Sequence, residues 1–100
     1  MPKVRITRTA ASDLESIQEQ GLTEFGALVA DEFMDGFERI FARLESYALL
    51  GRVAPEFGRE VRSCLHSSYR VLYRYEARVV SILRVTHTAQ RARPIEDTWE

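Results

Sequence analysis

The sequence predicts an α+β fold, in which a short N-terminal strand and an α-helical hairpin pack on a twisted antiparallel sheet of three or four strands. Two observations predict this fold. Apolar residues recur at helical spacing through the first half of the chain, whereas strand-forming residues dominate the second half. One hundred residues provide one hydrophobic core. We therefore expect a single domain over residues 1–100, with residues 88–100 as a C-terminal tail.

A short strand is predicted at residues 3–7, where apolar and polar residues alternate. A helix should follow, and the spacing leaves open whether Thr9 caps it or Ser12 and Glu15 form a capping box one turn later. Apolar residues then recur at helical intervals, namely Leu14, Ile17, Leu22 and Phe25. Gly26 predicts a break before the next helix.

The second helix has the clearest pattern in the chain. Its apolar stripe has the spacing of an amphipathic helix and consists of Ala30, Phe33, Met34, Phe37, Ile40, Phe41 and Leu44. We interpret this stripe as core rather than as a cofactor site, because Phe and Met residues at helical spacing most often pack inside a protein. The helical half should end within residues 49–58, which contain two Gly and one Pro.

Three strands are predicted in the second half, at residues 60–65, 69–76 and 79–87. The last two should form a hairpin that turns at Ala77 and Arg78. Because neither residue is Gly or Asn, a tight primed turn is disfavoured there and a longer loop can form instead. Residues 88–100 show no clean period, and Ile95 or Trp99 could anchor them as a tail.

Alternation sorts the side chains of the predicted hairpin onto two faces. The face expected to pack on the helices carries Val71, Tyr73, Leu83 and Val85. The opposite face mixes arginines with apolar residues, namely Arg70, Leu72, Arg74, Val80, Ile82 and Arg84. An exposed face of this composition is typical of a binding surface. The alternative is that these arginines pair with the acidic helices of the same chain.

The net charge of −1 hides a separation of charge along the chain. Residues 9–50 carry nine acids against two arginines, a net charge of −7, and residues 51–93 carry nine arginines against three glutamates, a net charge of +6. A basic second half suits an acidic partner, either nucleic acid or an acidic protein segment. A solvated face with ion pairs inside the chain is the alternative.

Several function classes are excluded or disfavoured by composition. No apolar run approaches the roughly 20 residues of a membrane span, and the N-terminus lacks a signal-peptide pattern. We therefore expect a cytoplasmic protein with no membrane contact. The single cysteine, Cys64, excludes an internal disulfide and a Cys-based zinc site. We expect neither a metal nor a cofactor.

His66 and His87 are the two candidate general bases or metal ligands. Ser63, Ser67 and Ser68 lie near His66 in sequence, but no nearby aspartate would orient that histidine, so a hydrolase triad is weakly supported. No cluster of Glu or Cys completes a metal site. Each histidine is therefore interpreted first as a structural or solvent-facing residue.

Three segments, taken in order, resemble the RelE/ParE superfamily of small bacterial toxins from type II toxin–antitoxin systems. They are "AASDLESI" after the first strand, "LLGR" after the long helix, and "VRSCLHSSYRVLYRYEARVVSILRVTH" on the C-terminal side. The resemblance implies a helical hairpin on a twisted antiparallel sheet, in agreement with the element order derived above. It also implies a toxin that is kept silent by an antitoxin made from the same operon.

The resemblance also implies which partners this chain binds, because the antitoxins of the family share one organisation. Such an antitoxin has an N-terminal part that binds DNA and dimerises, and a C-terminal segment that wraps the toxin. The resemblance thus implies a heterotetramer of two toxins and two antitoxins, which contacts DNA mainly through the antitoxin. An acidic amphipathic segment would match the charge and the apolar patches of the arginine face.

The superfamily has two branches with different activities. RelE-like toxins cut messenger RNA on the ribosome, whereas ParE-like toxins poison DNA gyrase by a mechanism that need not involve a catalytic site. Arg62 and Arg70 occupy two of the basic positions of the RelE-like nucleases. Cys64 and Thr88 occupy other basic positions of that set, and Pro94 falls where those nucleases have a tail tyrosine.

With half of the nuclease set missing, the chain looks more like a ParE toxin paired with a ParD-like antitoxin, and DNA gyrase is the implied target. No catalytic residue is then expected. The alternative is a RelE-like ribosome-dependent endoribonuclease, because some nucleases of the superfamily use a histidine. The candidate residues for binding the antitoxin or the target are Arg62, Arg70, Leu72, Arg74, Val80, Ile82, Arg84 and His87.

Overall fold

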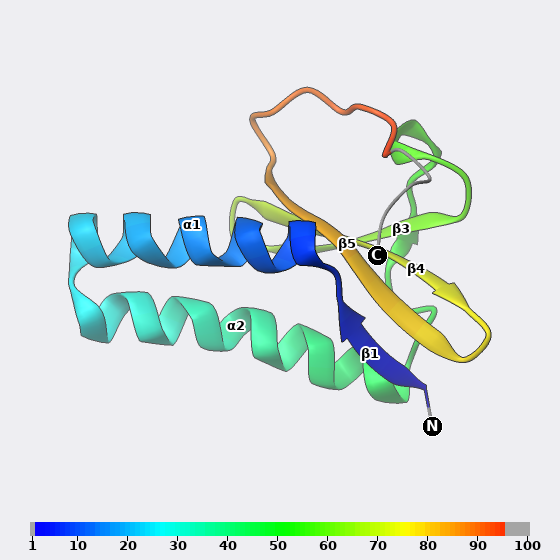
Figure 1. Cartoon of the computed structure of the whole chain (residues 1–100), viewed down its shortest axis with the longest axis horizontal. Helices are drawn as coiled ribbons and strands as arrows, with labels where there is room; N and C mark the ends of the chain where they lie inside the picture. Colours follow the sequence, from blue (N-terminus) through cyan, green and yellow to red (C-terminus); the bar gives the residue numbers. More distant parts are fainter. Residues whose placement is uncertain (1, 96–100) are drawn as a thin grey trace.

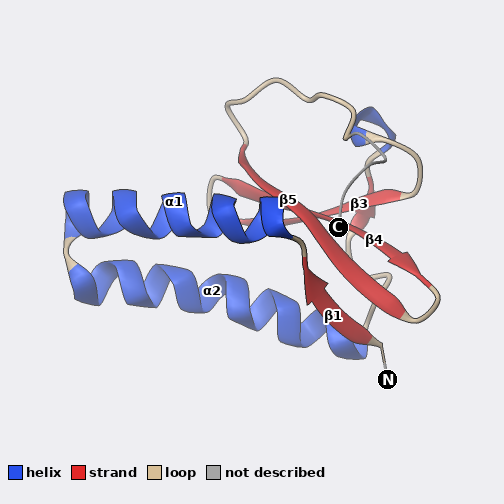
Figure 2. Cartoon of the chain, viewed as in Figure 1, coloured by secondary structure: helices blue, strands red, loops and turns tan. Residues whose placement is uncertain are grey.

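The computed structural model of the chain describes residues 2–95. Two antiparallel helices, α1 (Arg8–Phe25) and α2 (Ala27–Ser46), lie side by side against a five-stranded sheet, and their joined tips extend beyond it (Figure 1). Figure 2 shows the strands gathered on one side of the molecule, with long loops at the opposite end from the helix tips. Within the described residues, neither helix is long and apolar enough to cross a membrane.

The sheet has the strand order β1-β5-β4-β3-β2. Its strands are β1 (Lys3–Ile6), β2 (Arg52–Val53), β3 (Val61–His66), β4 (Tyr69–Glu76) and β5 (Val79–His87), with a 3-10 helix η1 (Pro55–Phe57) after β2. The predicted fold class is confirmed. The sheet is larger than expected because the two-residue β2 extends it beyond β3, and it is mixed because β1 pairs in parallel with β5.

The first helix begins before both predicted starts, two residues ahead of the one that Thr9 would cap. The side chain of Thr7 accepts a hydrogen bond from the Ala10 N–H (3.2 Å) and donates one to the Ile82 carbonyl (2.8 Å). The same hydroxyl therefore caps α1 and ties its start to β5, so helix α1 begins at Arg8. Neither Thr9 nor Ser12 is the cap, because Thr7 is held in the capping position by the hydrogen bond that it donates to a strand 75 residues away in sequence.

The connection between β4 and β5 is a tight two-residue turn, so the prediction of a longer loop is wrong. Glu76 pairs directly with Val79, and Ala77 and Arg78 adopt φ angles of 52° and 63°. Left-handed backbone costs a residue with a Cβ roughly 1–2 kcal/mol. A primed turn nevertheless fits the right-handed twist of the flanking strands, and the long β4–β5 ladder outweighs the local cost.

A β-bulge in β5 changes which side chains face the helices. The β4–β5 register shifts between Leu72 and Tyr73, so that Leu72 pairs with Arg84 and Tyr73 pairs with Ile82. Leu83 is the extra residue. Because of this extra residue, the side chains of β5 from Val80 to Leu83 face the side opposite to the one that simple alternation predicts. The predicted faces of three residues are therefore wrong. Val80 and Ile82 lie on the helix side, whereas Leu83 lies on the opposite side.

Two apolar clusters result, one on each face of the sheet. The helix-side cluster joins α1 and α2 to the sheet and is built from Ala10, Phe37, Phe41, Leu44, Ala48, Val71, Tyr73, Val80, Ile82 and Val85. The opposite cluster is built from Ala54, Phe57, Val61, Leu72 and Leu83. The apolar stripe predicted for the second helix is confirmed as core, since its residues are buried or pack against the helix-side cluster.

Candidate binding surfaces

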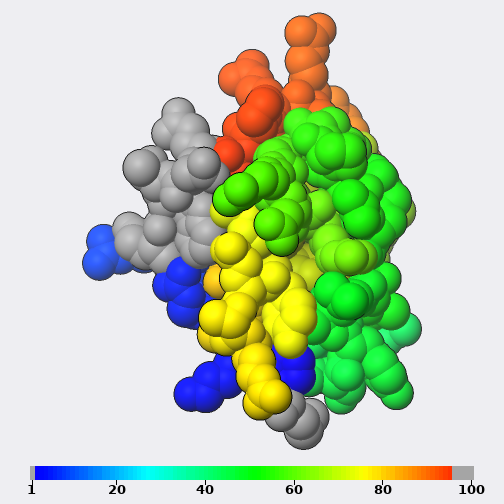
Figure 3. Space-filling view, turned by 90° about the vertical axis from the view of Figure 1, so that its right-hand side faces the viewer, coloured from blue at the N-terminus to red at the C-terminus, as the bar shows by residue number. Residues whose placement is uncertain are grey.

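The predicted arginine face is partly covered by other segments of the same chain. Helix η1 and the C-terminal segment, residues 88–95, lie over it, and the Ile95 N–H donates to the Phe57 carbonyl (2.7 Å). In Figure 3 the orange and red atoms of this segment lie against the green atoms of the chain around η1. Ile95 packs on the opposite cluster, which agrees with its predicted role as an anchor. The other predicted anchor, Trp99, lies outside the described residues.

Arg84 does not point freely into solvent. Its Nε donates to the Asp13 carboxylate on α1 (2.8 Å) and its Nη2 donates to the second carboxylate oxygen (3.3 Å). The Val85 N–H donates to the same carboxylate (2.9 Å). Asp13 therefore covers the edge of β5 beyond the point where β1 ends. At Arg84 the alternative interpretation, pairing inside the chain, describes the structure.

The other arginines of the face are partly occupied as well. Arg74 is 8% exposed, and its Nε donates to the Arg59 carbonyl (3.1 Å). Arg62, which lies outside this face because it stands opposite Tyr73 on the helix side of the sheet, donates to the Gly51 carbonyl (2.8 Å). Arg70 lies over the Phe57 ring, with 5.5 Å from its guanidinium carbon to the ring centroid, and its Nη1 is buried without a hydrogen-bond partner in the described part of the chain.

The remaining predicted site residues have different surroundings. Val80 and Ile82 are completely buried beneath the helices, and Leu72 is 1% exposed beneath η1, so a partner cannot reach them without rearrangement. His87 is half-buried. Its Nδ1 accepts from the Ala89 N–H (2.9 Å), and its ring meets Tyr69 edge to face at 5.1 Å between centroids.

A basic cleft remains between the sheet and the C-terminal segment. It has a volume of about 660 Å³, an apolar floor that includes Leu72 and Leu83, and Arg84, Arg91 and Arg93 along its walls. None of the residues that line it carries a carboxylate. Arginine forks bind carboxylates and phosphates, so this cleft can receive an anionic group. Of the predicted arginine face, this cleft includes Arg84, Leu72 and the edge near Thr86.

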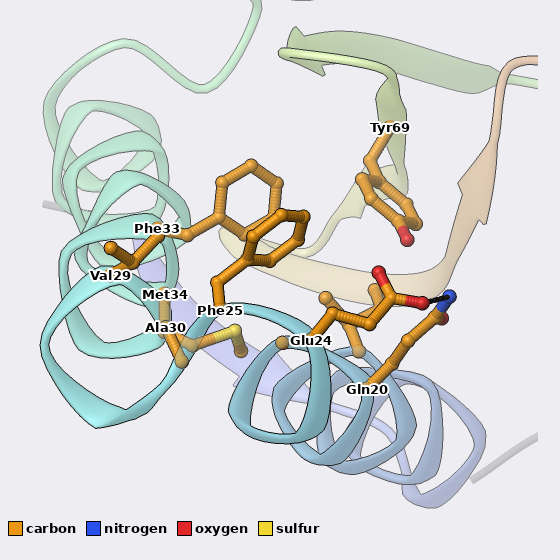
Figure 4. Close-up of a pocket in the computed structure, with 10 residues that line it drawn as sticks. Gln20, Glu24, Phe25, Val29, Ala30, Phe33, Met34 and Tyr69 are labelled. Carbon is orange, nitrogen blue, oxygen red and sulfur yellow. Dashed lines mark hydrogen bonds between the residues drawn. The ribbon is translucent and has the colours of Figure 1, made fainter.

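A second, apolar groove lies near the free end of the helical hairpin (Figure 4). It has a volume of about 210 Å³. Phe25 of α1 and Phe33 of α2 lie side by side on one flank, and Tyr69 of β4 faces them across the opening. Gln20 donates to Glu24 (3.3 Å) at the polar end. The two helices approach closely here, because the Cβ of Ala30 lies 3.3 Å from where a Cβ of Gly21 would be.

The hairpin tip next to this groove is unusually apolar for an exposed turn. Phe25 is 65% exposed, and Leu28 is 82% exposed. Leu22 and Val29 are also exposed. Large apolar side chains grouped on a surface mark an interaction site. The sequence analysis assigned Phe25 to a helical stripe and missed the groove. The overlooked signal is that apolar residues flank Gly26 on both sides, where a turn between helices would ordinarily be polar.

The histidine near α2 has a structural setting. His66 Nε2 lies 2.9 Å from the Phe33 carbonyl, and its ring packs against the rings of Phe33 and Phe37 at 4.6 and 4.7 Å between centroids. This ring fastens β3 to α2. Across residues 2–95, no group of three or more His, Cys, Asp or Glu side chains could hold a metal ion.

A helical hairpin on a five-stranded sheet, with an apolar groove and a basic cleft, defines a small protein suited to binding extended partners. The chain belongs to the ParE toxin family: the profile of the ParE toxin of the type II toxin–antitoxin system parDE matches residues 4–92. No curated protein matches the chain.

Two solved structures are similar. One is from the chromosomal ParDE toxin–antitoxin system of P. aeruginosa, with 22% sequence identity, a TM-score of 0.76, and coverage of 87% of this chain and 96% of that one. The other is from the toxin–antitoxin complex RelBE2 of Mycobacterium tuberculosis, with 30% identity, a TM-score of 0.57, and coverage of 87% and 99%. The predicted membership in the RelE/ParE superfamily, on the ParE side, is confirmed.

Proposed function

We propose that this protein is the toxin of a type II toxin–antitoxin pair, that a ParD-like antitoxin neutralises it by direct binding, and that its target is DNA gyrase. The observation that carries the proposal is the family match over residues 4–92. The similar structures from ParDE and RelBE2 systems support an antitoxin as the partner. The proposed complex is a cytoplasmic heterotetramer of two toxins and two antitoxins, in which the antitoxin makes the main DNA contacts.

The accessible surfaces fit an antitoxin segment with two kinds of side chain. Acidic groups would enter the basic cleft beside Arg91 and Arg93, and apolar groups would enter the groove between Phe25 and Tyr69. Arg70, Arg74 and Arg84 lie on the cleft side of the sheet. Arg62 and His87 lie opposite Tyr73 and Tyr69, on the helix side of the sheet. All five stay in the proposal as contact residues. Leu72, Val80 and Ile82 support that surface from beneath.

The gyrase target is preferred to RNA cleavage because of the chemistry that cleavage demands. Cleavage requires proton transfer from a 2′-hydroxyl and to a leaving oxygen. Arginines stabilise phosphate charge but cannot act as bases, because their pKa lies above about 12. His87 is the candidate base, and its Nδ1 already accepts a hydrogen bond from the backbone. Cys64, Thr88 and Pro94 leave the RelE-like set incomplete.

The proposal is tested with toxin purified away from its antitoxin. The protein is added separately to gyrase with supercoiled plasmid and to translating ribosomes. We expect trapped, cleaved plasmid and intact messenger RNA, and we expect the antitoxin encoded beside the toxin gene to abolish the effect.

The second candidate is a ribosome-dependent endoribonuclease, which the 30% identity with a chain of the RelBE2 complex favours. Messenger cuts at defined codons that disappear in the His87→Ala variant would establish that activity. Such cuts would show that the target is messenger RNA on the ribosome instead of gyrase. They would not affect the proposal that the protein is the toxin of a toxin–antitoxin pair.

A further inference from the structure

The loop that follows α2 carries a group of exposed apolar side chains, at the opposite end of that helix from the hairpin tip (Figure 1). Tyr47 is 66% exposed, Leu49 62%, Leu50 41% and Val53 55%. A single exposed leucine is normal on a protein surface, but a group of large apolar side chains marks an interaction site. These four residues form the Tyr47 patch. None of them lines the basic cleft or the apolar groove at the hairpin tip.

The backbone beneath the patch is fixed by two side chains of the sheet. The buried Tyr73 hydroxyl donates to the Ala48 carbonyl (2.9 Å) and accepts from the Gly51 N–H (2.8 Å). Arg62 Nη1 donates to the carbonyls of Gly51 (2.8 Å) and Leu49 (3.4 Å). The loop therefore presents its apolar side chains from a pre-organised backbone, which lowers the entropy lost when a partner packs on them.

The last turns of α2 place positive charge beside the patch. Arg39 and Arg43 precede Tyr47 by eight and four residues, so they lie on the face of the helix that leads to the patch. Both arginines are exposed, and neither pairs with a carboxylate within residues 2–95. From Arg39 to Val53 the chain has three arginines against one acid, Glu45. The patch is thus apolar at its centre and basic at its border.

We propose that the Tyr47 patch is the surface that docks on the target, and that it fits a protein surface with an apolar hollow bordered by aspartate or glutamate. Tyrosine and arginine are among the residues that dominate the binding energy of protein interfaces. Arginine forks bind carboxylates, so the basic border selects an acidic partner surface. A protein fits better than nucleic acid, because the patch has one aromatic ring and three aliphatic side chains, whereas nucleic-acid sites stack several bases on aromatic rings.

This inference rests on the proposed function for the identity of the target, DNA gyrase, and adds the face that contacts it. Tyr47 follows the 20-residue helix α2, which separates the patch from the hairpin tip by about 30 Å. The basic cleft lies on the other face of the sheet, whereas Tyr73, which holds the loop, belongs to the helix-side cluster. The target and the proposed antitoxin segment therefore contact different parts of the chain.

The test measures binding of the intact chain to immobilised gyrase from the same organism, by surface plasmon resonance without DNA. Leu49→Ser should bind about 10-fold more weakly than the parent, and Tyr47→Ser at least as weakly, because each removes an exposed side chain of the patch. The matched control is Leu65→Ser, which changes a leucine of similar exposure (66%) on the cleft face of the sheet. It should keep the parent's affinity.

Charge variants test the basic border. Arg39→Gln with Arg43→Gln should weaken gyrase binding about 5-fold and make it less sensitive to salt, because exposed ion pairs are screened. The control, Lys3→Gln with Arg78→Gln, makes the same change in net charge at exposed residues outside the patch. All of these variants should bind the antitoxin as tightly as the parent does, which also shows that they are folded.

The outcomes separate this inference from the proposed function. If the parent does not bind gyrase, both are wrong. If the parent binds gyrase and Leu49→Ser binds it as tightly as Leu65→Ser does, this inference alone is wrong. Binding that appears only after DNA is added would show that the contact is to nucleic acid, and equal losses in the two charge variants would show a response to net charge alone. Either result would overturn docking through the patch.

Discussion

At Gly36, helix α2 lies directly against the His66 side chain of β3, and replacing this glycine with alanine has two opposing effects on stability. A Cβ at this position would overlap Cε1 and Nε2 of His66, and it would lie 2.8 Å from Nδ1. The ring would have to leave its place between Phe33 and Phe37 and release the Phe33 carbonyl. Against this loss stands the better helix propensity of alanine.

The sizes of these two effects decide whether Gly36→Ala raises or lowers the free energy of unfolding. Alanine in place of glycine inside a helix stabilises by about 1 kcal/mol. The lost hydrogen bond costs about 0.5–1.5 kcal/mol, and each lost ring contact costs about 0.5–1.5 kcal/mol. We therefore expect Gly36→Ala to lower the free energy of unfolding by about 1–3 kcal/mol. In a His66→Ala background the obstacle is gone, and the same change should stabilise by about 1 kcal/mol.

The measurement is urea unfolding of the four proteins of the double-mutant cycle, with the free energy of unfolding extrapolated to water. The reversal of sign between the two backgrounds is the diagnostic result. If Gly36→Ala stabilises the parent as much as it stabilises the His66→Ala protein, then the ring does not hold α2 and β3 together as described.

Three further predictions concern the core. Phe37→Ala, at a side chain only 1% exposed, should cost about 3–5 kcal/mol in urea unfolding, whereas a loss below about 1 kcal/mol would mean that the stripe on α2 is not core. Tyr73→Phe should cost about 1–3 kcal/mol by the same measurement, because the buried Tyr73 hydroxyl donates to the Ala48 carbonyl (2.9 Å) and accepts from the Gly51 N–H (2.8 Å). Burial also raises the pKa of Tyr73 above its ordinary value of 10.0. The free energy of unfolding of the parent should therefore fall as pH rises above 10, and Tyr73→Phe should make this fall smaller. An identical pH dependence in the two proteins would contradict this assignment. Burial likewise raises the pKa of the Cys64 thiol, so iodoacetamide should alkylate the folded protein more slowly than the urea-unfolded chain at pH 8, and equal rates would show that the thiol is exposed.

The fold class was readable from the sequence because periodicity and core formation agree in this chain. The stripe from Ala30 to Leu44 has helical spacing and is core. The strands at residues 69–76 and 79–87 begin and end where predicted. Local patterns predict structure well where the same residues also carry the packing.

Two of the errors share one physical cause, which is that a distant element outweighed a local preference. Thr7 caps α1 because it also bonds to β5. Ala77 and Arg78 accept left-handed backbone because two long strands pair on either side of them. The bulge at Leu83 has no signal in the sequence, and it alone moved Val80 and Ile82 to the other face.

The candidate site was predictable in composition but not in accessibility. The arginines were identified from alternation and charge, yet nothing in the sequence indicates that Asp13 would reach Arg84 or that the C-terminal segment would cover Leu72. The groove at Phe25 was missed because a stripe of apolar residues normally indicates core. Here the helices extend beyond the sheet (Figure 1), and the last turn of that stripe, at Leu22 and Phe25, stays largely exposed.

The parallel pairing of β1 with β5 has a consequence for how the chain acquires its shape during synthesis. Lys3 lies opposite Val79 and Ile6 lies opposite Ile82. The first strand made must therefore wait for the last one before its edge of the sheet can form. Contacts between residues so far apart in sequence slow folding. That edge of the sheet stays incomplete until the ribosome has made the chain through Ile82, so the fold of the first residues is completed late in synthesis.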